Sequence, residues 1–281
     1  MKQFFVHFVA MLAALSSVAT LITFATGIQG SIQSIWPPIA IGVGILAICT
    51  LYAIIQTSRK KKIELNITSS LKLTIRQADL FKQNGIVVIG FNEYFDTHVG
   101  DGIVSPKTLH GLFINKYYKD HITDLDTDIT ASLVQQGINP IQQNCQRRHA
   151  AGKTDKYELG TCALVHDGGK KYVLVALSHF DQYDKANLTK EEFNTILSKL
   201  MIFLSDHAEA NEVHMPILGT GLARLNRSES RILHFIIDSL DFLHAQPILG
   251  GLYIDILSLK SAGVNLNVLE DHFKKGIKEE A

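Results

Sequence analysis

The N-terminal part of the chain is a long stretch without charged residues. Residues 3–58 contain no Asp, Glu, Lys or Arg, and a polar segment at 25–35 divides them into two apolar runs, 4–24 and 36–55. At about 1.5 Å per helical residue, each run is long enough to cross the roughly 30 Å hydrocarbon core of a bilayer. We therefore expect residues 1–58 to form a transmembrane helical hairpin.

Basic residues flank this expected hairpin at both of its ends. Lys2 precedes the first run, and Arg59 to Lys62 follow the second. Because cytoplasmic flanks are enriched in Lys and Arg, we expect both ends to lie in the cytoplasm. A signal peptide over Phe4 to Ala19 is the alternative, and it would reverse the topology of everything that follows.

The remainder of the chain has the length and charge balance of a single folded domain. We expect 59–70 to be a basic juxtamembrane linker and 71–281 to form one domain with a well-buried core. All but one of the 27 Lys and Arg lie at 59–281 with all 27 Asp and Glu, which gives a formal net charge of −1. This balance lacks the excess of basic residues that is typical of nucleic-acid-binding domains. Cys145 and Cys162 lack metal-ligand spacing, so no metal site is expected.

Six short apolar runs rich in β-branched residues predict strands in this domain. They lie at 71–76, 85–91, 160–165, 171–178, 213–218 and 251–259. Several are continuous rather than alternating, which is typical of strands buried on both faces. The pattern predicts an α/β fold, a three-layer α/β/α sandwich around a mixed sheet.

Capping patterns predict where helices of this sandwich begin. Thr189 with Glu192, and Asn226 with Glu229, are each spaced as a capping box and are followed by apolar residues at helical intervals. A third helix is expected over 105–118, with a proline at its first helical position.

The stretch PILGTGLARL (216–225) joins an expected strand to one of these helices. Gly219 and Gly221 allow backbone N–H groups to converge in a turn, and such a concavity of amides binds anions. The loop has no Lys to hold a γ-phosphate, which suits a bound diphosphate better than a triphosphate that is cleaved. Arg224 could add a charge-assisted contact. A plain strand-to-helix turn is the alternative interpretation.

The segment ADLFKQNGIVVIGFN (78–92) resembles the opening signature of macro domains. The resemblance covers about residues 70–262 and implies a macro-like domain in which Asp79, beside Leu80, recognises an adenine amino group and Asn92 contacts ribose. From the residues alone, Asp79 could instead be a helix or turn cap, and Asn92 an Asx-turn at a strand end.

Two glycine-containing loops extend this resemblance. HVGDGIV (98–104) lies where macro domains have their first phosphate loop, and GTGLAR (219–224) matches their second. The resemblance implies that both loops hold the diphosphate of an ADP-ribose-like ligand. The residues implied to bind it are Gly100, Asp101, Gly102, Ile103, Gly219, Thr220, Gly221, Leu222, Ala223 and Arg224.

The resemblance to macro domains also argues against catalysis. IGFN and GDG stand where catalytically competent macro domains have an NAAN strand end and a run of three glycines. His98, Asp101, His110 and His179 could serve as acid or base, but no nucleophile–base pair is evident. We therefore assign no catalytic residue and no cofactor, and we expect a binding protein rather than an enzyme.

Two expected spans joined to a divergent macro domain resemble the membrane effectors of type II Thoeris antiphage systems. In that family a TIR-domain protein makes the nucleotide signal histidine-ADP-ribose, the macro domain binds it, and the effector assembles in the membrane and compromises the cell. The resemblance implies a multi-pass protein of the bacterial inner membrane with its N-terminus and macro domain in the cytoplasm. It also implies a ligand-induced homo-oligomer in the lipid bilayer and abortive infection.

Two other functions stay open at this point. A membrane-tethered ADP-ribosylhydrolase would turn over an ADP-ribosylated substrate. A docking module would instead bind ADP-ribosylated proteins at the membrane. Signal binding differs from both because it requires a free small molecule and a change in the state of assembly.

Overall fold

The chain forms two compact units, Met1–Lys60 and Lys61–Ala281, and each is described by itself. The computed structural model describes residues 5–6, 8–17, 36–57, 60–147, 149–181, 183, 185–220, 227–243 and 247–280. Side chains of 36–42, 55–57 and 274–280 are not included in that description.

The described residues of the first unit are helical except for Lys60. Residues 8–17 are helical, and α2 (Trp36–Thr57) contains the second apolar run. Part of the first run, 18–24, lies outside the described residues. Within the described part of the chain, no helix combines the length and the hydropathy needed to cross a membrane.

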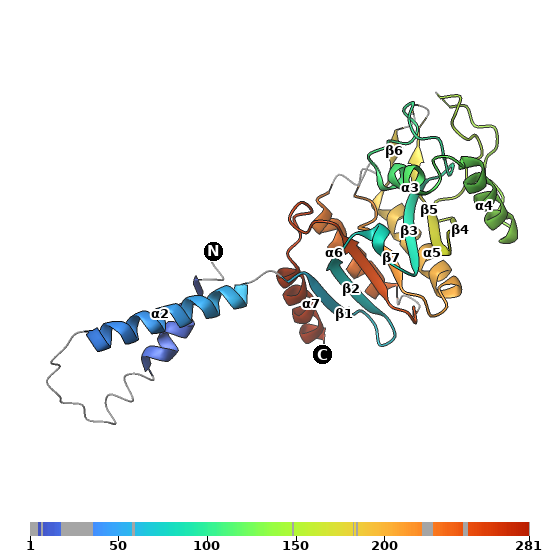
Figure 1. Cartoon of the computed structure of the whole chain (residues 1–281). Helices are drawn as coiled ribbons and strands as arrows, with labels where there is room; N and C mark the ends of the chain where they lie inside the picture. The colour runs from blue at the N-terminus through green and yellow to red at the C-terminus, as the bar shows by residue number, and fades with distance from the viewer. Residues whose placement is uncertain are drawn as a thin grey trace. The chain divides into compact units, whose positions relative to one another are not determined.

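The second unit is built on a mixed sheet (Figure 1). The sheet runs in the order β1-β2-β8-β7-β3-β5-β4, and β6 pairs with β5. β2, β8, β7, β3 and β5 are parallel neighbours, whereas β1, β4 and β6 are antiparallel to theirs. The strands are β1 (Lys62–Asn66), β2 (Lys72–Gln77), β3 (Ile86–Asn92), β4 (Cys162–Asp167), β5 (Lys170–Phe180), β6 (Ala186–Asn187), β7 (Val213–Met215) and β8 (Leu252–Ile256).

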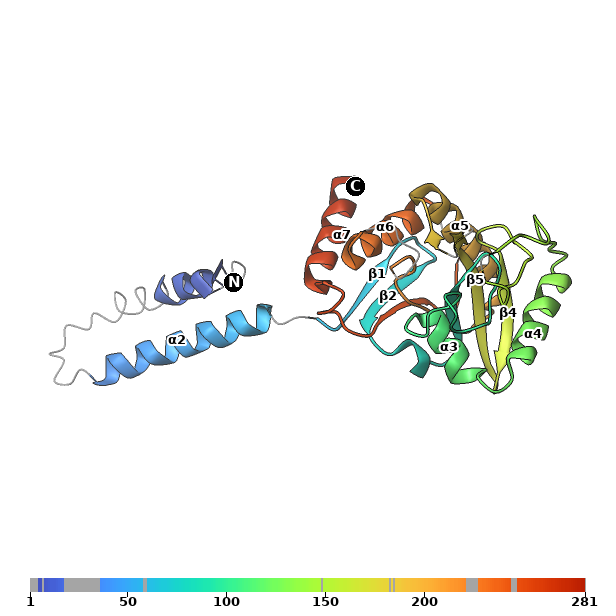
Figure 2. The same ribbon diagram turned by 90° about the horizontal axis from the view of Figure 1, so that it is seen from above.

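Helices cover the sheet from both sides, so the three-layer α/β/α prediction is confirmed. Figure 2 shows α5, α6 and α7 on one side and α3 and α4 on the other. Two buried clusters fill the layers: Ile86 and Val88 pack into the first, and Val87 and Ile89 into the second. The helices are α3 (Leu109–Tyr117), α4 (Ile122–Gln135), α5 (Lys190–His207), α6 (Glu229–Phe242) and α7 (Leu266–Glu280), with a 3-10 turn, η1, at Leu80–Lys82.

All six predicted strands are present, and one strand lies where a linker was expected. β1 occupies 62–66, where Ile63 and Leu65 are buried and their neighbours are exposed. The basic residues that precede it concealed this short alternation. β1 pairs with β2 and belongs to the sheet, so the ordered domain begins before residue 71.

Of the three predicted helix starts, only the one at Thr189 is correct. The Thr189 side chain accepts from Glu192 N while Glu192 reaches back, so α5 has the expected capping box. α6 instead begins after Ser228, whose side chain caps Arg231 N, and Asn226 lies outside the described residues. The Asn226 prediction failed because a second capping residue stands nearer to the helix.

The third helix also begins later than predicted. Thr108, not Ser105, is the N-cap of α3, and its hydroxyl accepts from Gly111 N at 3.1 Å. Thr108 N and its hydroxyl both donate to Ser105 O, so the residues around Pro106 form a turn that folds back on the helix. A Cβ on Gly111 would lie 2.3 Å from Ser105 O, which shows how closely this turn packs.

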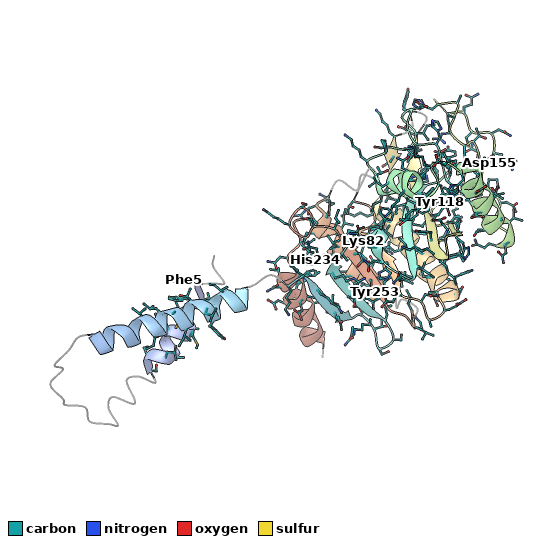
Figure 3. All side chains as sticks on the ribbon, in the orientation of Figure 1. Phe5, Lys82, Tyr118, Asp155, His234 and Tyr253 are labelled. Carbon is teal, nitrogen blue, oxygen red and sulfur yellow. The ribbon has the colours of Figure 1, made fainter. Side chains whose placement is uncertain are left out.

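Side chains close the outer edge of β4. Leu164 N donates to Ser132 Oγ at 2.8 Å, and Cys162 O accepts from Gln136 Nε2 at 3.1 Å. Tyr118, labelled in Figure 3, donates its hydroxyl to His166 O at 3.2 Å. These contacts occupy backbone groups through which an edge strand could pair with another chain.

Ser132→Ala is expected to destabilise the domain by about 1 kcal/mol, the typical net contribution of one hydrogen bond, because the partly buried Leu164 N loses its acceptor. Thermal unfolding followed by circular dichroism measures this change. Thr130→Ala is the matched control, because its exposed hydroxyl bonds only to Asp126 O on the same helix. Equal stability of the two variants would contradict the assigned role of Ser132.

Candidate functional site

A cavity of about 550 Å³ lies at the carboxyl ends of the central parallel strands. Its walls come from the ends of β3 and β5, the turn and first residues of α3, the loop after β7 and the start of α6. Ligands of open α/β sheets bind at this edge, because loops diverge there and leave a crevice. We therefore take this cavity as the candidate site.

A glycine within β3 helps to form the cavity. Gly90 lies in β3, and a Cβ at this position would come within 2.6 Å of Leu177 Cδ2. Both residues line the cavity, together with Phe91 and Phe180. Gly90 thus leaves room for the Leu177 side chain. The part of the wall formed by these residues is apolar, as in most small-molecule sites.

Asn92 lies at the cavity wall, but its side chain is also part of a turn. Asn92 Oδ1 accepts from Tyr94 N at 3.0 Å and from Asp96 N at 3.3 Å. Its Nδ2 donates to Asp96 Oδ2 at 2.8 Å. The Asx-turn considered from the sequence is therefore present. One of the two Nδ2 hydrogens is used in this bond, which leaves a second for another acceptor.

A buried ion pair supports this turn. Arg147 Nη1 lies 2.8 Å from both carboxylate oxygens of Asp96, and the two side chains are 3% and 1% exposed. Lys153 N also donates to Asp96 Oδ1 at 2.8 Å, and the guanidinium lies 4.3 Å from the Tyr94 ring centroid. Asp96 therefore links the strand end at Asn92 to the distant segment around Arg147.

The second glycine-containing loop is described only in part. Gly219 lines the cavity at φ 80°, a left-handed conformation that favours glycine. Thr220 also lines it, and its hydroxyl donates to Ile217 O at 2.9 Å. Gly221, Leu222, Ala223 and Arg224 lie outside the described residues, so their expected contacts stay predictions.

In the first expected phosphate loop, Ile103 alone among the four implied residues is at the cavity wall. Gly100, Asp101 and Gly102 form a tight turn with φ of 113°, 49° and 82°, closed by Ile103 N donating to Gly100 O at 2.9 Å. The exposed Asp101 carboxylate lies 2.8 Å from His98 Nε2. Gly100, Asp101 and Gly102 are not among the residues that line the cavity, and their phosphate contacts stay predictions.

Asp79, expected to recognise adenine, and its neighbour Leu80 lie outside the cavity lining as well. Asp79 caps η1: its Oδ1 accepts from Phe81 N at 3.1 Å, and its Oδ2 is 4.0 Å from Lys82 Nζ. Leu80 is buried in the cluster beneath α3. The cap considered from the sequence is therefore present, and recognition of adenine by Asp79 stays a prediction.

His110 is a cavity residue whose role the sequence left undefined. It is 9% exposed, and its ring centroid lies 3.6 Å from that of Phe91. Its Nε2 is 2.8 Å from Asp96 O, a carbonyl oxygen that can only accept, so Nε2 carries the proton. Burial lowers the pKa of His110 to about 3, so the ring is neutral at physiological pH.

The other two histidines considered as acid or base are held by carboxylates. His98 pairs with Asp101 at the exposed turn. His179 lies between Glu93, in contact with Nδ1, and Glu192, whose Oε1 is 3.0 Å from Nε2. Glu93 is fully buried and also accepts from Phe180 N at 2.9 Å. This cluster joins the end of β5 to the start of α5.

Several cavity residues were not identified from the sequence. Ser178 ends the expected strand 171–178, and the rule that ligands meet the carboxyl ends of parallel strands could have found it. Thr108 and Lys107 lie in the turn before α3, which was mistaken for helix. Glu229 was read only as part of a capping box, yet it also lines the cavity.

Comparisons with known proteins identify the family of this chain. Residues 73–248 match the family described as Thoeris protein ThsA, Macro domain. The Thoeris protein ThsA of Bacillus amyloliquefaciens (strain Y2) is 31% identical over 201 residues, which cover 69% of this chain and 65% of that relative. The chain thus aligns with less than two thirds of the relative's length.

Solved macrodomains are similar at lower identity. A mutant macrodomain of Oceanobacillus iheyensis with ADPR is 13% identical, with a TM-score of 0.48 over 76% of this chain and 99% of that chain. The macrodomain of Mycobacterium tuberculosis DarG is 15% identical, with a TM-score of 0.40 over 66% and 98%. Because the family match covers more than half of the sequence, this chain belongs to the family of Thoeris ThsA macro domain proteins.

Proposed function

We propose that the cavity binds an ADP-ribose-type nucleotide and that the protein acts in Thoeris antiphage defence. The observation that carries this proposal is the family match over 73–248, which spans every strand and loop that forms the cavity. A volume of about 550 Å³ is within the usual range for small-molecule sites.

The chemistry of the lining fits a nucleotide with sugar hydroxyls and a diphosphate. Phe91 and Phe180 offer apolar surface, while Asn92 and Ser178 offer polar groups at strand ends. Gly219 lets the loop backbone approach a ligand closely, as the diphosphate contact implied by the sequence requires. Lys107 adds a positive charge to the lining.

We further propose histidine-ADP-ribose, made by a TIR-domain partner, as the signal, and ligand-induced assembly in the bacterial inner membrane as the response. The uncharged residues 3–58 and the basic residues that flank them support a membrane hairpin. A ligand drives assembly only when it binds the assembled state more tightly. The size distribution of the detergent-purified chain, with and without histidine-ADP-ribose, tests this step, and an unchanged distribution with bound ligand would overturn it.

Calorimetry of the purified full-length chain tests ligand binding itself. We expect saturable binding of ADP-ribose and of histidine-ADP-ribose, and weaker binding of AMP, which lacks the diphosphate. Absence of saturable heat with both ADP-ribose ligands would refute the proposal. Time-dependent cleavage of an ADP-ribosyl conjugate would favour the hydrolase, and binding restricted to ADP-ribosylated proteins would favour the docking module.

A further inference from the structure

The unused ring nitrogen of His110 has a fixed chemical character. Because Nε2 donates to Asp96 O, a neutral ring leaves Nδ1 with a lone pair and no proton. No hydrogen bond to Nδ1 is present among the described residues. The residue therefore presents an acceptor, and not a donor, through its second nitrogen.

This acceptor is open to the cavity. Among the described side chains, the buried N and O atoms without a hydrogen-bond partner are Tyr172 Oη and His214 Nε2. His110 Nδ1 also has no hydrogen-bond partner, but it is not among these buried atoms. It is therefore accessible from the surface of the protein. Since His110 is 9% exposed and lines the cavity, the cavity is where Nδ1 meets solvent or ligand.

We propose that His110 is a specificity-determining residue: its Nδ1 accepts a hydrogen bond from a hydroxyl group of the bound nucleotide and excludes phosphate oxygens from that position. The inference rests on the proposed function, since a sugar nucleotide carries both groups. A lone pair attracts a hydroxyl hydrogen and repels an anionic oxygen. The diphosphate must then lie elsewhere in the cavity, and this sets the orientation of the bound ligand.

Two substitutions separate recognition from structural support. Gln places its amide near the position of Nε2 and can still donate to Asp96 O, but it lacks an acceptor at the Nδ1 position. Asn places its amide oxygen near Nδ1 and loses the bond to Asp96. If Nδ1 recognises the ligand, affinity and stability should rank these variants in opposite orders.

Calorimetry of the full-length chain with ADP-ribose gives the first readout. We expect His110→Gln to weaken binding about 10-fold and His110→Asn only about 3-fold, as the loss of one neutral hydrogen bond predicts. Thermal unfolding should show the reverse, with His110→Gln closer to the wild type. If His110→Gln bound ADP-ribose as tightly as His110→Asn, or more tightly, the proposal would be overturned and His110 would be a structural residue.

A measurement without ligand keeps the proposal testable if ADP-ribose fails to bind. Nitrogen NMR of the chain labelled at histidine, with the His110→Gln chain to assign the signal, reports which ring nitrogen is protonated. A neutral ring with the proton on Nε2 at neutral pH supports the acceptor. A doubly protonated ring, or a proton on Nδ1, overturns it independently of the proposed function.

Discussion

Gly219→Val is expected to weaken ADP-ribose binding about 100-fold, which corresponds to about 2.7 kcal/mol. Gly219 has φ 80° and lines the cavity. A β-branched residue at positive φ is strained by about 1–3 kcal/mol, and the loop relieves that strain only by moving its backbone. That movement would displace the backbone amides that we expect to face the ligand. Calorimetry of the full-length variant measures the loss.

Gly169→Val is the matched control for this experiment. Gly169 has φ 81°, almost the same as Gly219, but it lies in the turn between β4 and β5, and a Cβ there would meet nothing within 4 Å. The two variants therefore place valine at matched positive φ. We expect Gly169→Val to lower thermal stability without changing the affinity for ADP-ribose. Equal affinities in the two variants would remove the Gly219 loop from the site.

The layers of the fold were predictable because they depend on local patterns. The run at 85–91 alternates between two buried faces, and only a central strand covered on both sides has that property. Thr189 and Glu192 specify a helix start through contacts three residues apart. By contrast, Thr108 replaced Ser105 as a cap because the turn before it packs against Gly111, and such packing is a property of the folded chain.

The polar organisation of the site was less predictable because its partners are far apart in the sequence. The sequence predicted a contact with the bound nucleotide for both Asn92 and Asp79. The hydrogen bonds present in the structure are instead the turn and cap interactions that the sequence also allowed. Arg147 is 51 residues from Asp96. The state of His110 depends on burial beside Phe91, which no local pattern reveals.

The buried Asp96–Arg147 pair leads to the prediction with the largest effect on stability. Arg147→Met is expected to destabilise the domain by about 3–5 kcal/mol, because it leaves the buried Asp96 carboxylate without its counter-charge. Thermal unfolding followed by circular dichroism measures the loss, and calorimetry should show weaker ADP-ribose binding as the Asn92 turn loosens. The control is Lys62→Met, which removes an exposed partner of Glu64 and should change stability little. Equal stability of the two variants would mean that water or another cation compensates Asp96, and the turn at the cavity wall would then not depend on Arg147.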